Sequence, residues 1–261
     1  MKMVYAGAIV TAIVIAAGAA IIIPVFYQKP AVSPQFSVSQ PTAILSFSVV
    51  NGNNVPIWCN DLFSVFKKYG IKATVFITGK IASKYPQCVS AFSSSFSSSN
   101  DNNIDIGSQT YDYVNLASIP NYSAAFEEIK NGKQAVDYAG KIDSKLFKAP
   151  YGVTDQNIYS LLNRSGIVAD FSYAHQYNKY MNGQFIRYDL IAYNGSNYSS
   201  KKQLLNSLSS TKLPVLINFD NSTPISQVDS FISNLKSENK DIHFVNASEL
   251  TGMNLTIKRK L

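Results

Sequence analysis

The chain has 261 residues, of which 46% are hydrophobic and 15% are charged. This composition excludes a disordered chain and supplies enough apolar material for one large domain. The formal net charge is +7, but the basic residues are spread along the chain. Because the sequence has neither zinc-finger spacing nor a recognition-helix signature, we expect no nucleic-acid partner.

An almost unbroken apolar run extends from residue 3 to residue 26, with one Tyr and one Thr as its only polar side chains. An apolar helix needs about 20 residues to cross a bilayer. A cleavable secretory signal has a shorter core of about 7–15 residues that is followed by a small-residue cleavage site. Here the Ala and Gly residues lie inside the run, so residues 1–26 are predicted to be an uncleaved transmembrane signal anchor. Cleavage near Ala20 or after Pro24 is the alternative.

Two features place the rest of the chain on the extracytoplasmic side of that membrane. Seven N-x-S/T sequons are present, and a secreted chain can be glycosylated at such sites. Cys59 and Cys88 are the only cysteines, an even number that is compatible with one disulfide in an oxidising compartment. Two buried thiols are the alternative to that disulfide.

The globular body is predicted to begin at residue 42, after a stalk. Residues 27–41 are rich in Pro, Ser and Gln and show neither a helical nor a strand period, which indicates an extended segment. Residues 42–261 then form the domain. Its first elements are a buried strand at 43–49, a helix capped by Asn60 or Asp61 and stopped by Gly70, and a second strand at 71–78.

Strands and helices continue to alternate through the rest of the domain. Further strands are predicted at 104–107, 145–150, 167–173, 185–193, 213–219 and 241–245, and further helices at 79–92, 123–140, 155–166, 201–210 and 224–239. Strands separated by helices pair in parallel, so the fold class is α/β, and about eight strands over roughly 220 residues favour a barrel over an open sheet. In a barrel the chemistry lies at the carboxyl ends of the strands.

Four segments are similar to motifs of the polysaccharide deacetylase (NodB-homology) family. "KYGIKATVFITGKIASKYPQCV" is similar to the family's first helix-strand-helix unit. "IGSQTYDYVNL" is similar to its metal motif, in which a Gly-Asn/Ser-His-Thr stretch is followed by a second His four residues after the first. "FKAPYG" is similar to its Arg-x-Pro-Tyr-Gly motif, and "LPVLINFD" to the strand that ordinarily ends in a catalytic His. The resemblance extends from about residue 42 to residue 250.

The resemblance implies a distorted β/α barrel that removes acetyl groups from N- or O-acetylated sugars. In the family, one Asp and two His hold a divalent metal, usually zinc, that activates water, while a neighbouring Asp is the base and a His near the end of the chain is the acid. In this chain other residue types stand at all of these positions: Ser48 at the base, Val49 at the ligand Asp, Gln109 and Tyr113 at the two ligand histidines, Lys148 at the motif Arg, and Phe219, within one residue, at the acid His.

These replacements predict a protein without the family's metal or catalytic residues. A zinc site needs three or four ligands from His, Cys, Asp or Glu, and valine and the tyrosine cannot supply one. We therefore expect no zinc, and a domain that recognises a cell-surface glycan or serves the structure of the cell envelope. The candidate groove-lining residues are Ser48, Asn51, Gln109, Asp112, Tyr113, Lys148, Tyr151, His175 and Asp220, and the tyrosines among them suit a sugar ring.

Other interpretations remain open. An active hydrolase of amide or ester acetyl bonds on sugars could use a rearranged site around Ser48, Lys148, Asp112 and Asp220. His175 with the two aspartates could form a new metal site, and Asp220 could simply cap the turn that follows it. The only other histidine, His243, is expected at the end of the last strand as a structural residue.

Overall fold

The computed structural model describes residues 41–52, 54–94, 103–154, 156–172, 186–187, 191–194, 215–238, 242–252 and 256–259. The predicted anchor, nearly all of the stalk, His175 and the predicted helix at 201–210 lie outside these ranges. Within them, no helix has both the length and the apolar character that a bilayer crossing requires.

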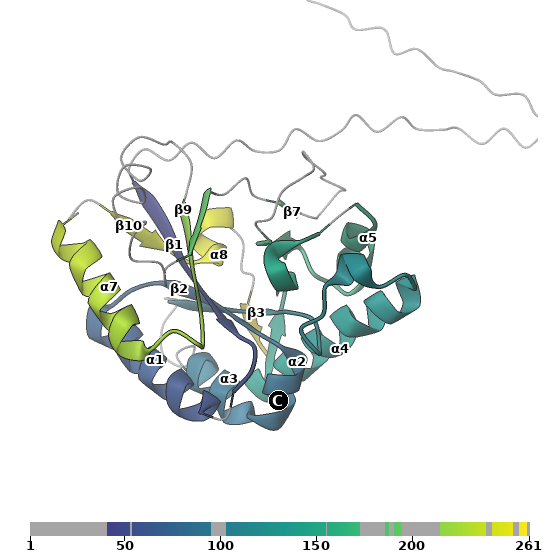
Figure 1. Ribbon diagram of the computed structural model, residues 1–261, viewed down its shortest axis with the longest axis horizontal. Helices are drawn as coiled ribbons and strands as arrows, with labels where there is room; N and C mark the ends of the chain where they lie inside the picture. The colour runs from purple at the N-terminus through teal and green to yellow at the C-terminus, as the bar shows by residue number, and fades with distance from the viewer. Residues whose placement is uncertain are drawn as a thin grey trace, which may run out of the picture. The chain divides into compact units, whose positions relative to one another are not determined.

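A curled parallel sheet forms the centre of the domain (Figure 1). Within the described residues, its strands are β1 (Thr42–Val49), β2 (Ala73–Ile77), β3 (Ile104–Ser108), β5 (Leu146–Phe147), β6 (Ala169–Asp170), β7 (Ile186–Arg187), β8 (Ile191–Asn194), β9 (Val215–Asp220) and β10 (His243–Val245). Their order is β7-β6-β5-β3-β2-β1-β9-β8, and β10 pairs with the first half of β1. Two more strands, β4 (Ile142–Ser144) and β11 (Thr256–Lys258), form a separate antiparallel pair.

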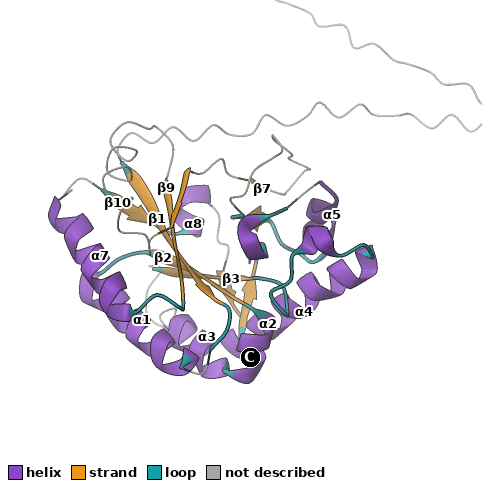
Figure 2. Cartoon of the chain, viewed as in Figure 1, coloured by secondary structure: helices purple, strands orange, loops and turns teal. Residues whose placement is uncertain are grey.

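Helices cover the outer face of this sheet (Figure 2). They are α1 (Val55–Tyr69), α2 (Gly79–Lys84), α3 (Pro86–Ser93), α4 (Tyr122–Gly140), α5 (Gln156–Arg164) and α7 (Ile225–Glu238). Alternate residues of the strands face them, and the largest apolar core joins β1, β2, β3 and β9 to α1, α3, α4 and α7. Two short 3₁₀ turns, Leu116–Ser118 and Pro150–Gly152, follow β3 and β5.

The inner face of the sheet is closed at the amino ends of its strands by α8 (Ala247–Thr251). Ala247 and Leu250 of this helix pack against Ile44 and Leu216 in a second, smaller apolar cluster. Ser248 donates its backbone N–H and its hydroxyl to buried Asp105, at 2.6 and 2.7 Å. Burial raises the pKa of Asp105 to about 6, against the lowering effect of these hydrogen bonds. Among the described residues, α8 therefore covers the inner face at the amino ends of the strands.

Several sequence-based boundaries differ from the structure. The first helix begins at Val55, with Pro56 in its first turn and Asn54 before it, so the predicted cap at Asn60 or Asp61 is wrong. Apolar side chains of that early turn pack into the core, which extends the helix beyond the polar residues that resemble a cap. Gly70 does end the helix, in a left-handed conformation that glycine adopts at little cost.

The predicted single strand at 185–193 is also wrong. Residues 186–187 form β7 beside β6, whereas residues 191–194 form β8 beside β9, at the opposite end of the strand order. Pro86 divides the predicted helix at 79–92 into α2 and α3 because proline cannot donate the backbone hydrogen bond that a continuous helix needs. β10 is not the last strand, since β11 follows it.

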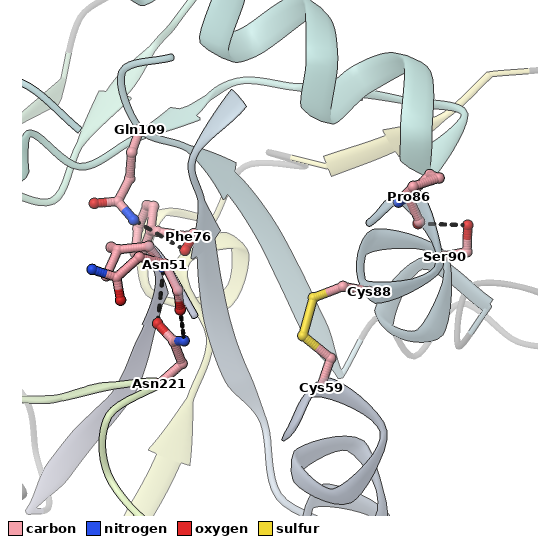
Figure 3. The surroundings of a disulfide bond; sticks show 9 residues. Asn51, Cys59, Phe76, Pro86, Cys88, Ser90, Gln109 and Asn221 are labelled. Carbon is pink, nitrogen blue, oxygen red and sulfur yellow. Dashed lines mark hydrogen bonds between the residues drawn. A yellow bond between two sulfur atoms is a disulfide. The ribbon is translucent and has the colours of Figure 1, made fainter. Parts of the chain in front are cut away.

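Cys59 on α1 and Cys88 on α3 form a disulfide, 29 residues apart in sequence (Figure 3). Both residues are buried in the core between the helices and the sheet. The bond ties together two helices that pack against each other.

Removing this disulfide by the double substitution Cys59→Ala and Cys88→Ala is expected to lower the free energy of unfolding by about 2–4 kcal/mol, because the unfolded chain regains the entropy of an open loop. Urea unfolding followed by circular dichroism measures the change. Reducing the wild-type protein should give a similar loss, and the double variant should then be insensitive to reductant. An unchanged midpoint in both cases would contradict a structural role for the bond.

Candidate functional site

The polar site lies on the inner face of the sheet, where alternate residues of β1 and β9 pair side by side. The registered pairs are Ile44 with Leu216, Ser46 with Asn218, and Ser48 with Asp220. Side chains of a strand alternate between its two faces, so these residues share the face that is turned away from α1 and α7. The inner face therefore changes from apolar to polar toward the carboxyl ends of the strands.

Lys148 crosses this polar layer from the end of β5. Its Nζ donates to Asn218 Oδ1 at 2.6 Å and to Ser46 Oγ at 3.0 Å, and it lies 4.8 Å from the centre of the Phe76 ring. The Ser46 hydroxyl also lies 3.2 Å from the same Asn218 oxygen. One ammonium group thus joins β5, β2, β1 and β9 across the inside of the curled sheet.

Burial makes this ammonium group unusual. Lys148 is only 2% exposed, and desolvation lowers its pKa from 10.5 to about 7, although the nearby carboxylate of Asp220 opposes that change. The hydroxyl and amide around it are neutral. The pKa of Lys148 therefore lies far below that of an exposed lysine and close to neutral pH.

Gln109 stands at the position of the first metal-binding histidine in the family motif. It is also buried, with an exposed fraction of 1%. Its Nε2 donates to the backbone oxygen of Phe76 at 3.2 Å, as Figure 3 shows. Its Oε1 is buried without a hydrogen-bond partner. The side chain is thus held by the neighbouring strand.

Asn221 holds the loop that follows β1, next to the two positions, Ser48 and Val49, at which the family's paired acids would stand. Its side-chain oxygen accepts from Val50 N at 2.9 Å, and its amide donates to the backbone oxygen of Asn51 (Figure 3). Its backbone N–H also donates to Ser48 O at 3.0 Å. Ser48 itself is 4% exposed. These bonds fasten the end of β1 to the end of β9.

The two candidate aspartates have local structural partners. Asp220 Oδ1 accepts from the backbone N–H of Ser222 at 2.9 Å and also from the Ser222 hydroxyl, which caps the turn after β9. Asp112 lies at the surface and pairs with Lys80 at 2.9 Å. The structure brings Asp220 near Lys148, whereas the contacts of Asp112 are with α2 and with Glu128 of α4.

Val49 and Phe219 belong to the opposite face of the sheet. Both are fully buried in the helix-side core, where Phe219 stacks on Phe47 with ring centres 5.3 Å apart. The residues at the metal positions do not fit a zinc ion, because one is a hydrocarbon packed in the core and Gln109 is an amide already engaged. Within the described residues, no three His, Cys, Asp or Glu side chains gather in a metal-binding group.

Tyr113 and Tyr151 meet at the ends of β3 and β5. Their ring centres are 5.3 Å apart at an interplanar angle of 48°. Both residues have a left-handed backbone, with φ of 60° and 59°. Tyr151 is 57% exposed, and Tyr113 is half-buried. They are the candidate groove residues that present an aromatic surface to solvent.

Sequence reasoning missed Ser46, Asn218 and Phe76, which surround the Lys148 ammonium group. The alternation in "VLINFD" carried the signal for Asn218: Val215, Ile217 and Phe219 face the helices, so Asn218 must face inward. The interpretation of the acid position as Phe219, within one residue, included Asn218, and the structure places that neighbour in the polar layer.

The model of the polysaccharide deacetylase family matches residues 38–169, half of the chain. A family 4 carbohydrate esterase from Streptomyces lividans, in complex with acetate, has 18% sequence identity and a TM-score of 0.55, over 77% of this chain and 90% of that chain. A CE4 family pseudoenzyme from Bacillus anthracis has 14% identity and a TM-score of 0.58, over 81% and 66%. Peptidoglycan deacetylase PdaC from Bacillus subtilis has 17% identity and a TM-score of 0.56, over 85% and 93%.

The curled α/β sheet of this chain is the fold of these solved structures. The chain belongs to the polysaccharide deacetylase family, whose members include both active enzymes and pseudoenzymes. The likeness to the solved structures shows the fold alone. No curated protein is detectably similar to the sequence.

Proposed function

We propose that this chain is a non-catalytic member of the polysaccharide deacetylase family that binds a cell-surface glycan. In this proposal residues 3–26 anchor it in a membrane, and the domain lies on the extracytoplasmic side. The apolar length of the anchor, the sequons and the disulfide support the location.

The observation that carries the proposal is the chemistry of the strand ends. Where the family holds a metal and its acids, this chain has a serine, a valine, a glutamine and a tyrosine. The valine is packed in the helix-side core, and Gln109 and Ser48 are buried. A water molecule at these positions would have neither the metal ligands nor the aspartate base through which the family activates it.

The relatives support a role on glycans. Two of the similar structures are described as a carbohydrate esterase and a peptidoglycan deacetylase, and a third as a pseudoenzyme of the same family. A mutant of that pseudoenzyme is described as having restored enzymatic activity. A family domain can therefore keep its fold after its activity is lost, and glycan binding is the part of the ancestral function that needs no metal.

The test is an acetate-release assay beside a glycan array, using the full-length protein in detergent. With zinc, cobalt, nickel or manganese and N-acetylglucosamine oligomers or a generic acetyl ester, we expect no acetate above the metal-only blank, because the chain lacks the base and the acid. The Streptomyces lividans esterase is the positive control. Metal-dependent release that a chelator abolishes would overturn the non-catalytic proposal, and an array without any signal would remove glycan binding.

One observation favours an active hydrolase as the second candidate. Lys148 Nζ lies 3.0 Å from Ser46 Oγ, and a lysine with a lowered pKa can take the proton of a serine nucleophile. Both side chains are buried, however, with exposed fractions of 0% for Ser46 and 2% for Lys148. In the same assay this candidate predicts metal-independent ester hydrolysis that Ser46→Ala abolishes, whereas our proposal predicts none.

A further inference from the structure

Tyr113 and Tyr151 have a backbone conformation that their residue type does not explain. Three non-glycine residues have positive φ in the described part of the chain. The third, Lys141, is the left-handed residue that ends α4, a common conformation at the end of a helix. Neither tyrosine ends an α-helix, and the left-handed region is sterically unfavourable for an aromatic residue. Such strain persists where surrounding structure imposes it, and it gathers at binding sites.

The surrounding structure does impose both conformations. Before Tyr113, the backbone N–H of Tyr111 donates to Glu128 O at 2.9 Å, and Val114 N donates to Thr110 Oγ1 at 3.1 Å. Gly132 of α4 leaves room for this loop, since a Cβ there would lie 2.3 Å from Gln109 O.

Beside Tyr151, the backbone N–H of Ala149 donates to Ser172 Oγ at 2.8 Å, and Gly152 N donates to Ala149 O at 2.9 Å. The two loops leave β3 and β5, which are neighbouring parallel strands. Their tyrosines are therefore fixed side by side before any ligand arrives.

Core packing does not account for this arrangement. More than half of Tyr151 is exposed, so the strained residue buries little apolar surface in return. The faces of two tyrosines are apolar and their hydroxyl tips are polar, and the nearby surface charges of Lys80 and Asp112 compensate each other. Such a surface matches a neutral ring that has one C–H face and equatorial hydroxyl groups.

We infer that Tyr113 and Tyr151 form a preorganised aromatic platform that stacks on one pyranose ring of a glycan. The inference rests on the proposed function and names the residues and the ligand class of that binding site. The left-handed backbone holds the two rings at the strand ends, and the hydroxyl groups contact the sugar hydroxyls. No metal takes part in the binding.

The test compares stability with binding in full-length Tyr113→Gly and Tyr151→Gly variants. Glycine accepts positive φ without strain, so each variant should unfold at the wild-type temperature or above it. Binding to the oligosaccharides that score on the glycan array, measured by isothermal titration, should weaken at least about tenfold because a stacked aromatic face is lost. Tyr151→Phe, which keeps the ring, should retain most of the affinity.

Tyr138→Ala is the matched control, since Tyr138 is an 87% exposed tyrosine on α4, and it should bind like the wild type. If no glycan binds the wild-type protein, the proposed function fails. If glycans bind the wild type and both glycine variants equally well, the platform is wrong while the proposed function stands. Loss of folding in both glycine variants would also overturn the inference, because the two tyrosines would then be structural.

Discussion

Replacing Lys148 with methionine should stabilise the protein at pH 6 by about 1–4 kcal/mol, because it removes a buried ammonium group whose desolvation costs several kcal/mol. The lysine ammonium is buried among a serine, an asparagine and a phenylalanine ring, and the nearby carboxylate of Asp220 offsets only part of the cost of its desolvation. Methionine fills a similar volume without a charge. The gain in stability is smaller than the full cost of desolvation, because methionine cannot form the two hydrogen bonds that Lys148 makes to Ser46 and Asn218.

The pH dependence identifies the cause. In the unfolded chain Lys148 keeps its ordinary pKa of 10.5, whereas burial lowers the pKa to about 7 in the folded protein. Between these values the unfolded state binds more protons than the folded state, so the contribution of Lys148 to stability rises with pH from about 7 to about 10.5 and is constant below pH 7. The advantage of Lys148→Met should therefore be full at pH 6 and should vanish near pH 10.

Urea unfolding of both proteins from pH 6 to pH 10 measures this dependence. Lys67→Met, at an exposed position on α1, is the matched control and should show no such trend. Lys148→Arg restores the residue type of the family motif but should destabilise the protein at every pH, because a guanidinium cannot lose its proton. A Lys148→Met variant that is less stable than the wild type at pH 6 would show that the hydrogen bonds of the ammonium outweigh its desolvation.

The strand-end positions of several candidate residues could be predicted from sequence because parallel strands end at one edge. Each of four candidates follows or ends a strand pattern, and the structure places all four at the carboxyl ends of strands of the one parallel sheet: Ser48, Gln109, Lys148 and Asp220. The order of the family motifs along the chain indicated which residue stands at each of the family's metal and catalytic positions. It was harder to predict toward which face of the sheet each side chain points. Val49 and Phe219 occupy motif positions, but their side chains pack against the helices on the outer face.

Other features of the fold and the site could not be predicted from the sequence, because they depend on contacts between residues that are far apart along the chain. The burial of Lys148 follows from the curl of the sheet, which brings β1 and β9 within reach of the end of β5. The left-handed tyrosines follow from loops fixed by α4 and β6, in a conformation that sequence statistics assign to glycine or asparagine. The separation of β7 from β8 depends on partner strands that are distant in sequence.

Introducing a histidine near the end of β9 should destabilise the protein to very different extents at two adjacent positions. Phe219→His is expected to lower the free energy of unfolding by roughly 3–5 kcal/mol, because it opens a cavity and buries imidazole nitrogens without partners. Phe219 is fully buried, stacks on Phe47, and meets the edge of Phe231 with ring centres 5.2 Å apart. Its helix-side environment offers no site for an acid that must reach substrate.

Asn218→His should cost only about 1–2 kcal/mol, since an imidazole nitrogen can replace the amide oxygen as the acceptor for Lys148. Ile217→His is the matched control for Phe219→His, because Ile217 lies on the same helix-side face, and its loss should be comparable. Thermal unfolding of the three variants under one condition compares them. Equal losses for Asn218→His and Phe219→His would contradict the difference between the two faces of β9. The expected contrast would confirm that Asn218 faces the polar layer and Phe219 the helix-side core.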